Sequence, residues 1–434
     1  MKLKTFLIVG CLGGLFTLSS CTAPTNVKDY SAYVNPFIGT GGHGHTFPGA
    51  VVPHGMIQPS PDTRIDGWDA CSGYYYADST INGFSHTHVS GTGCCDYGDV
   101  LLMPTVGKQQ YRTTDPQSQR LAYASSFSHK NEIAEPGYYS VFLDTYQVKA
   151  EISSTKRGAI HRYTFPENAE SGFIIDLDYS LQRQTNSEME IEVISDTEIC
   201  GHKKTTYWAF DQYINFYAKF SKPFSYTLVT DSNKDEQVLV KVGVSAVDIA
   251  GARKNVESEI PGWDFEKVRK DARTAWNEYL SKIDITTSDK EDKAIFYTAL
   301  YHTGISPNLF TDADGRYLGM DLEVHQGDTL NPIYTVFSLW DTFRALHPLM
   351  TIIDPDLNNH FINSLIKKHQ EGGIYPMWDL ASNYTGTMIG YHAVPVIVDA
   401  YMKGYRNFDA KEAYKACLRA AEYDTTGIKC PDLV

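Results

Sequence analysis

The sequence predicts a multidomain chain in which an antiparallel β-sandwich is followed by an incomplete α/α toroid. Three observations support this prediction. Residues 33–260 contain short runs of β-branched and aromatic residues separated by turn residues, which is typical of a sandwich. From residue 261 onward the apolar residues instead recur at helical spacing, and long loops join the segments. These helices are fewer than a closed ring of six helix pairs requires.

The chain begins with a predicted export signal. Lys2 and Lys4 precede an apolar run at 6–18 that is too short to span a bilayer. Cys21 follows this run, where bacterial lipoprotein processing acylates a thiol, so we predict lipidation of Cys21 and contact with a membrane through the anchor. We expect the protein in the bacterial cell envelope, in the periplasm or on the outer-membrane surface. An ordinary secretion signal with an incidental Cys21 is the alternative.

Composition narrows the classes of partner. The chain has 52 acidic and 38 basic residues and a net charge of −14, which argues against nucleic acid as a partner. It also has 29 tyrosines, whose rings suit sugar faces, although most are expected in the core. The later cysteines lack zinc-type spacing, and we read them as mostly free. A bridge from Cys71 to Cys94 or Cys95 is the alternative.

The β half is predicted from alternating apolar positions between turn residues. The clearest strand segments are residues 138–143, 158–165, 172–176 and 237–244. The helical half opens with an amphipathic stretch at 261–287, which we interpret as a linker helix. The predicted segments are therefore a signal peptide at 1–21, a tether at 22–32, a β-sandwich domain at 33–260, the linker helix at 261–287, and the first part of the toroid at 288–434.

Capping signals define the helices after the linker. Ser288 with Glu291 forms a capping box, and Asp409 with Glu412 starts the last helix. The intervening helices are expected at about 337–352, 356–371 and 390–403, and Gly372-Gly373 ends the second of these. Each helix must bury an apolar stripe against its neighbours, so an open half-ring leaves a broad apolar edge uncovered. We therefore expect this chain to be a fragment.

Candidate functional residues in the β half lie near glycine-rich loops. The loop at 39–50 lacks the phosphate-loop pattern, and we read it as a tight turn or as backbone that approaches a ligand. His86 and His88 are expected on one strand face, where they would bind sugar hydroxyls or serve as structural histidines. A zinc site is disfavoured because no third ligand lies nearby. Trp68 is a candidate stacking platform.

Two tryptophan–aspartate pairs, Trp340-Asp341 and Trp378-Asp379, stand at loop-to-helix junctions. Sugars pack C–H groups on aromatic faces while their hydroxyls donate to carboxylates, so these pairs are candidate sugar sites. The structural alternative is a tryptophan in the core and an aspartate that caps a helix or pairs with Arg344. The full predicted surface comprises Trp340, Asp341, Arg344, Trp378, Asp379 and Asn383, together with Trp68, His86 and His88.

Several segments together resemble glycoside hydrolase family 92. They are residues 34–41, 48–56, 60–63, 83–88, 338–344 and 383–392, and the resemblance runs in order from Tyr33 to about Val434. It implies an N-terminal supersandwich, a linker and a C-terminal (α/α)6 domain. It further implies calcium-dependent, inverting exo-α-mannosidases that act on terminal α-mannosides of N-glycans or mannans, with mannose bound between the domains. Inversion requires an acid and a base about 6.5 to 9.5 Å apart.

The chain departs from the family pattern at its catalytic groups. The segments resembling the general acid, the base and most calcium ligands are expected beyond Val434, so no catalytic residue or metal ligand is assigned on this chain. The first functional interpretation is the N-terminal part of an α-mannosidase. The alternative is a non-catalytic mannoside-binding lipoprotein or an inactive gene remnant.

Overall fold

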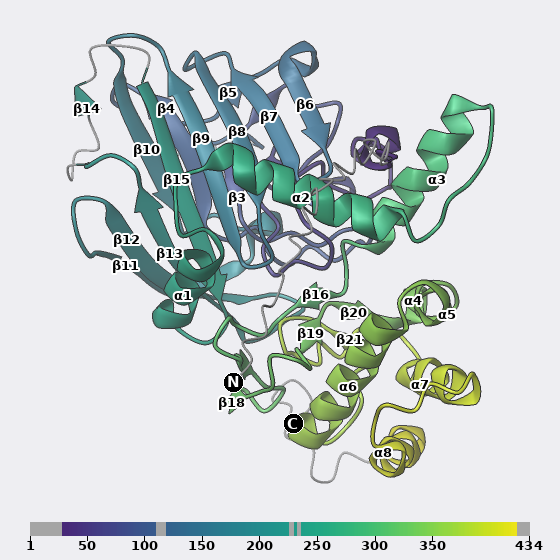
Figure 1. Ribbon diagram of the computed structural model, residues 1–434. Coiled ribbons are helices and arrows are strands. Elements are labelled where there is room, and N and C mark those ends of the chain that lie inside the picture. Colours follow the sequence, from purple (N-terminus) through teal and green to yellow (C-terminus); the bar gives the residue numbers. More distant parts are fainter. Residues whose placement is uncertain (1–27, 110–118, 225–229, 232–235, 423–434) are drawn as a thin grey trace, which may run out of the picture.

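The computed structural model describes residues 28–109, 119–224, 230–231 and 236–422. The predicted signal peptide and Cys21 lie outside these residues. The predicted order of a β-rich half followed by a helical half is confirmed (Figure 1). No helix in the described part is long and apolar enough to cross a membrane. The closed or open form of the predicted toroid stays a prediction.

The β half consists of two antiparallel sheets that enclose one apolar core. The larger sheet has eight strands in the order β11 (Thr185–Val193), β12 (Glu198–Thr206), β13 (Gln212–Phe220), β15 (Glu236–Ser245), β9 (Gly158–Phe165), β8 (Val148–Ser154), β7 (Tyr138–Leu143) and β6 (Glu132–Glu135). The smaller sheet has the order β1 (Ser60–Asp62), β3 (Gly83–Ser85), β4 (Leu101–Val106), β10 (Glu170–Asp176) and β14 (Thr230–Asp231). A separate pair joins β2 (Thr80–Ile81) to β5 (Ser125–Ser126). The four strand segments predicted from alternation fall on β7, β9, β10 and β15.

A helix occupies part of the stretch expected to be strands. This helix, α1 (Ile249–Glu259), begins at Asp248, whose carboxylate accepts a hydrogen bond from the Gly251 amide at 2.6 Å. It packs on the outer face of the larger sheet, where a Cβ at Gly243 would lie 2.2 Å from the Ala252 carbonyl oxygen. The absence of a side chain at Gly243 therefore lets the helix approach the sheet.

The linker helix forms within the predicted stretch. This helix, α2 (Phe265–Leu280), runs across the larger sheet beside β7, β8 and β9 (Figure 1). The next helix, α3 (Lys290–Thr303), is capped by Asp289, which accepts hydrogen bonds from the Glu291 and Asp292 amides. The expected cap at Ser288 is therefore wrong by one residue, because the Asp289 carboxylate accepts from both amides.

The expected helix at 337–352 is interrupted. Ala345 has φ −128° and ψ −56°, and this non-helical backbone separates α4 (Leu339–Thr342) from α5 (Leu346–Ile353). The helix α6 (Pro355–Gly372) ends, as expected, at Gly373 in the left-handed conformation. The remaining helices are α7 (Ala393–Met402) and α8 (Ala410–Glu422). Three short strand pairs complete the helical half: β16 (Asn308–Leu309) with β19 (Tyr334–Thr335), β17 (Arg316–Leu318) with β18 (Val324–Gln326), and β20 (Phe337–Ser338) with β21 (Trp378–Asp379).

A loop of the β half is held by the helical half. The indole nitrogen of buried Trp276 donates to the Val51 carbonyl at 2.6 Å. The His54 amide donates to the Gly304 carbonyl at 2.6 Å, and the His54 carbonyl accepts from the Leu309 amide at 3.0 Å. His54 has φ +54°, an uncommon conformation for a residue other than glycine. We call this set of contacts the interdomain clasp.

We predict that Trp276→Ala lowers the free energy of unfolding by about 3 to 5 kcal/mol, because it leaves a cavity and an unpaired Val51 carbonyl. Urea denaturation followed by circular dichroism measures the change. Trp263→Phe is the control, since Trp263 is half-buried and is not one of the residues that form the clasp. Equal losses in the two variants would contradict a stabilising role for the clasp.

Candidate functional site

The two tryptophan–aspartate pairs are brought together by the β20–β21 pair. Ser338 lies opposite Trp378, and Phe337 lies opposite Asp379. The chain leaves β20 directly into α4, so Trp340 and Asp341 occupy the first turn of that helix. Both side chains are exposed to solvent, and Trp340 retains 39% of its accessible surface. The short strand pair therefore fixes the position of an exposed ring and carboxylate.

Hydrogen bonds orient the Asp341 carboxylate. The Trp378 indole N–H donates to the Ser338 hydroxyl oxygen at 2.6 Å, and that hydroxyl donates to Asp341 Oδ2 at 2.5 Å. An indole N–H can only donate, so the direction of both hydrogen bonds is fixed. We call this chain the Trp378–Ser338–Asp341 relay. The other Asp341 oxygen, Oδ1, forms no hydrogen bond with a described residue.

Trp378 itself offers no face to a ligand. It is fully buried, and its ring meets that of Trp208 at a centroid distance of 5.8 Å and an angle of 87°. The interpretation of Trp378 as a second stacking plate is therefore wrong. It supports Asp341 instead, because the interior encloses the ring while its N–H reaches Ser338.

Asp379 is likewise an interior residue. Its carboxylate lies 2.9 Å from the Lys368 ammonium and accepts a hydrogen bond from the Thr335 hydroxyl at 2.8 Å. Burial raises the pKa of Asp379, and the Lys368 charge opposes that shift. The ion pair anchors β21 to α6 and is enclosed, so the prediction that Asp379 contacts a sugar is wrong for this arrangement.

Asn383 joins the two halves of the chain. Its side-chain oxygen accepts from the Asp211 amide at 2.9 Å, and its side-chain nitrogen donates to the Asp211 carbonyl at 3.2 Å. These bonds occupy both ends of a buried amide, which gives it a structural role. Arg344 is exposed, with its guanidinium carbon 5.2 Å from the Phe343 ring centroid. It forms no ion pair with Asp341 or any other described residue, so it stays a candidate ligand contact.

His86 belongs to a buried hydrogen-bond chain. Its Nδ1 lies 2.7 Å from the Val100 carbonyl, so Nδ1 carries the proton and Nε2 accepts from His161 Nε2 at 3.0 Å. His161 Nδ1 then accepts from the Tyr163 hydroxyl at 2.9 Å. Burial lowers the pKa of His86 to about 4, which keeps the ring neutral. The structural alternative holds for His86.

His88 is also enclosed. Its Nδ1 faces the Gln58 carbonyl at 2.7 Å, and its Nε2 faces the Asp62 carboxylate at 2.9 Å and the Ser85 hydroxyl at 3.1 Å. Strand β3 ends at Ser85, so the expectation that both histidines share a strand face is wrong. Neither ring reaches solvent. Within the described ranges, no three histidine, cysteine or acidic side chains gather to hold a metal ion.

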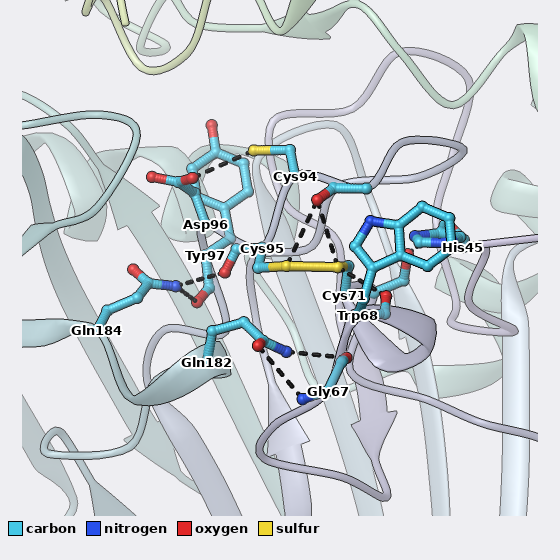
Figure 2. The surroundings of a disulfide bond; sticks show 12 residues. His45, Gly67, Trp68, Cys71, Cys94, Cys95, Asp96, Tyr97, Gln182 and Gln184 are labelled. Atoms are coloured by element: carbon cyan, nitrogen blue, oxygen red, sulfur yellow. Dashed lines mark hydrogen bonds between the residues drawn. A yellow bond between two sulfur atoms is a disulfide. The ribbon is translucent and has the colours of Figure 1, made fainter. Parts of the chain in front are cut away.

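Trp68 is the exposed aromatic candidate of the β half. It retains 58% of its accessible surface and meets His45 edge-on at a centroid distance of 4.3 Å. The Gln182 side chain accepts from the Gly67 amide at 3.2 Å and donates to the Gly67 carbonyl at 3.0 Å (Figure 2). These bonds hold the start of the Trp68 turn in place.

A disulfide between Cys71 and Cys95 fastens the other end of this turn (Figure 2). One of the two alternative bridges is therefore formed, whereas Cys94, Cys200 and Cys417 carry free thiols. Cys94 belongs to an apolar cluster that also contains Trp378, so the Trp68 turn and the Trp340 junction border one interdomain cluster. The sequence did not indicate Trp208 and Ser338, whose contacts with Trp378 join distant positions, or Lys368, whose ion pair with Asp379 joins α6 to β21.

Solved structures resemble this chain over most of its length. A family GH92 α-mannosidase of Bacteroides thetaiotaomicron is 35% identical, with a TM-score of 0.86, over 91% of this chain and 57% of that one. It has also been solved with mannoimidazole, again with a TM-score of 0.86. A family GH92 inverting mannosidase from the same species is 28% identical, with a TM-score of 0.79, over 93% of this chain and 57% of that one.

A curated relative, an uncharacterised secreted glycosidase of Arthroderma benhamiae, is 28% identical over 91% of this chain and 52% of its own length. The chain thus spans about half the length of the relatives that it matches. Two models of one family match consecutive parts of the chain. The glycosyl hydrolase family 92 N-terminal domain matches residues 33–246, and the family 92 catalytic domain matches residues 251–431. The chain therefore belongs to glycosyl hydrolase family 92.

Proposed function

We propose that this chain carries part of the sugar-binding surface of an inverting exo-α-mannosidase that cleaves terminal α-mannosides of N-glycans or mannans. Family membership supports the proposal, and so do the similar mannosidases, one of them solved with mannoimidazole. The single observation that carries it is the exposed Trp340–Asp341 pair held by the Trp378–Ser338–Asp341 relay.

The chemistry of the pair suits a pyranose ring. A sugar packs its C–H face on the exposed Trp340 ring while a hydroxyl donates to Asp341. Arg344, three residues after Asp341, supplies donors for a ring or hydroxyl oxygen. Because Ser338 already satisfies one Asp341 oxygen, little ordering is needed when the sugar binds.

A second candidate function is mannoside binding without catalysis. The relay is assembled entirely from residues of this chain, which favours binding by the chain alone. The calcium dependence implied by the family stays a prediction. Within the described residues, no three histidine, cysteine or acidic side chains lie close enough together to hold a metal ion. We further propose an extracytoplasmic location with a lipid anchor on Cys21, supported by the export-type leader and the secreted relative.

We predict that Trp340→Ala weakens methyl α-mannoside binding by about 1 to 3 kcal/mol, because the stacking area is lost. Isothermal titration measures the affinity. Tyr414→Ala removes a similarly exposed ring from α8 and serves as the control. An unchanged affinity for Trp340→Ala would assign the ring a purely structural role.

We predict that Ser338→Ala weakens the same binding by about 1 to 3 kcal/mol, since it removes a donor to Asp341 and leaves the Trp378 N–H unpaired. Ser338→Thr keeps the hydroxyl and should retain most of the affinity. Equal affinities for the alanine and threonine variants would show that the relay does not orient Asp341.

We predict that the purified 434-residue chain does not hydrolyse mannosides, because positioning residues cannot replace a general acid and base. Release of mannose from α-linked mannobioses, with and without added calcium, is the measurement. Calcium-dependent release would contradict the prediction and place the acid and base on this chain.

A further inference from the structure

The turn between β12 and β13 contacts both halves of the chain. We call this turn, residues 207–211, the bridging tip. On the side of the β half, the Ala209 amide donates to Asp96 Oδ1 at 3.0 Å, and both residues are fully buried. On the side of the helical half, the backbone of Asp211 exchanges two hydrogen bonds with the Asn383 side chain. The bridging tip is therefore held from both sides.

The bridging tip also packs on the segment that carries Trp378. The Trp208 ring meets the Trp378 ring edge-on, with a centroid distance of 5.8 Å and an angle of 87°. Asn383 closes the segment that begins at Trp378, since its backbone exchanges two hydrogen bonds with Leu380. The tip thus contacts residues 378–383 at both ends. Aromatic pairs prefer an edge-on geometry, so the Trp208 ring restricts rotation of the Trp378 ring.

The orientation of the Trp378 ring matters because its N–H begins the relay. This N–H donates to the Ser338 hydroxyl at 2.6 Å, and the Ser338 hydroxyl donates to Asp341. Hydrogen bonds weaken steeply when they are bent. A rotated Trp378 ring would therefore lose the bond to Ser338, and the freed hydroxyl could turn away from Asp341.

We propose that Trp208 is a positioning residue, whose ring holds Trp378 in the orientation that lets the relay orient Asp341. Trp208 also packs against the apolar cluster that contains Trp378, so filling space is the competing explanation. Any apolar side chain of suitable size can fill space, whereas positioning requires a ring. The consequence for mannoside affinity rests on the proposed function, but the effect on the Trp378 indole does not.

The first test observes the indole N–H groups of the full chain without any sugar. The six tryptophans are isotope-labelled, and Trp378→Phe and Trp276→Phe assign two of their NMR signals. We expect Trp208→Met, which keeps an apolar side chain and removes the ring, to shift the Trp378 signal and to speed its exchange with solvent. Trp208→Phe should return the signal toward its parent position. An unchanged Trp276 signal verifies in each variant that the clasp is intact.

The matched control is Phe210→Met, because it removes an exposed ring from the same bridging tip. It should leave the Trp378 signal unchanged.

The second test measures methyl α-mannoside affinity by isothermal titration. Trp208→Met should weaken binding by about two- to tenfold, the size expected when one aromatic pair is lost. In a chain that already carries Ser338→Ala, Trp208→Met should cause no further loss, because the relay is already broken.

Three outcomes would overturn the proposal. The Trp378 signal could be the same in Trp208→Met and Phe210→Met, Trp208→Phe could behave like Trp208→Met, or Trp208→Met could weaken binding equally with and without Ser338→Ala. A parent chain that binds no mannoside would instead overturn the proposed function, because the indole signals are measured without sugar and still decide the role of Trp208.

Discussion

The interdomain clasp is the constraint on which the rest of the structure depends. The loop that contains it contributes to two cores, since Ala50 and Ile57 pack inside the sandwich while Phe47 and Val51 pack among the helices. Ala50 and Val51 are adjacent in the chain, and their side chains pack in different cores. The unusual backbone of His54 is held by hydrogen bonds from both sides, as expected where surrounding structure compensates local strain. This loop packs in both cores, so it holds the β half and the helical half in one relative position.

The two tryptophan–aspartate pairs show how one dipeptide acquires two roles. Trp340 and Trp378 look equivalent in the sequence, and the β20–β21 pair places their junctions side by side. The difference is burial: Trp378 packs on Trp208 from the β half, whereas Trp340 stands on the first turn of a short helix. Trp378 contributes its N–H to the relay, whereas the face of Trp340 stays open to solvent. An enclosed ring thus orients an exposed carboxylate through one serine hydroxyl.

Sequence patterns predicted the elements whose formation depends on residues that are close in the chain. Alternation located β7 and β9, and the Gly372-Gly373 signal located the end of α6, because both effects act within a few residues. The burial of His86 and Asp379 was not predictable in this way. His86 bonds to His161, 75 positions away, and the charge that pairs with Asp379 on β21 comes from Lys368 on α6. A polar residue beside a turn looks the same in the sequence whether its partner is a sugar or a distant side chain. Only the tertiary contacts separate the two cases.

The Cys71–Cys95 disulfide makes the position of Trp68 depend on whether the chain folds in an oxidising or a reducing compartment. One end of the Trp68 turn is held by ordinary hydrogen bonds from Gln182, and the other end is held covalently. Disulfides persist outside the reducing cytosol. A chain kept in the cytosol would carry two additional thiols beside the buried Cys94, and its Trp68 turn would be fastened at one end only. An oxidising compartment would therefore fasten both ends of the Trp68 turn, and a reducing compartment only the end that Gln182 holds.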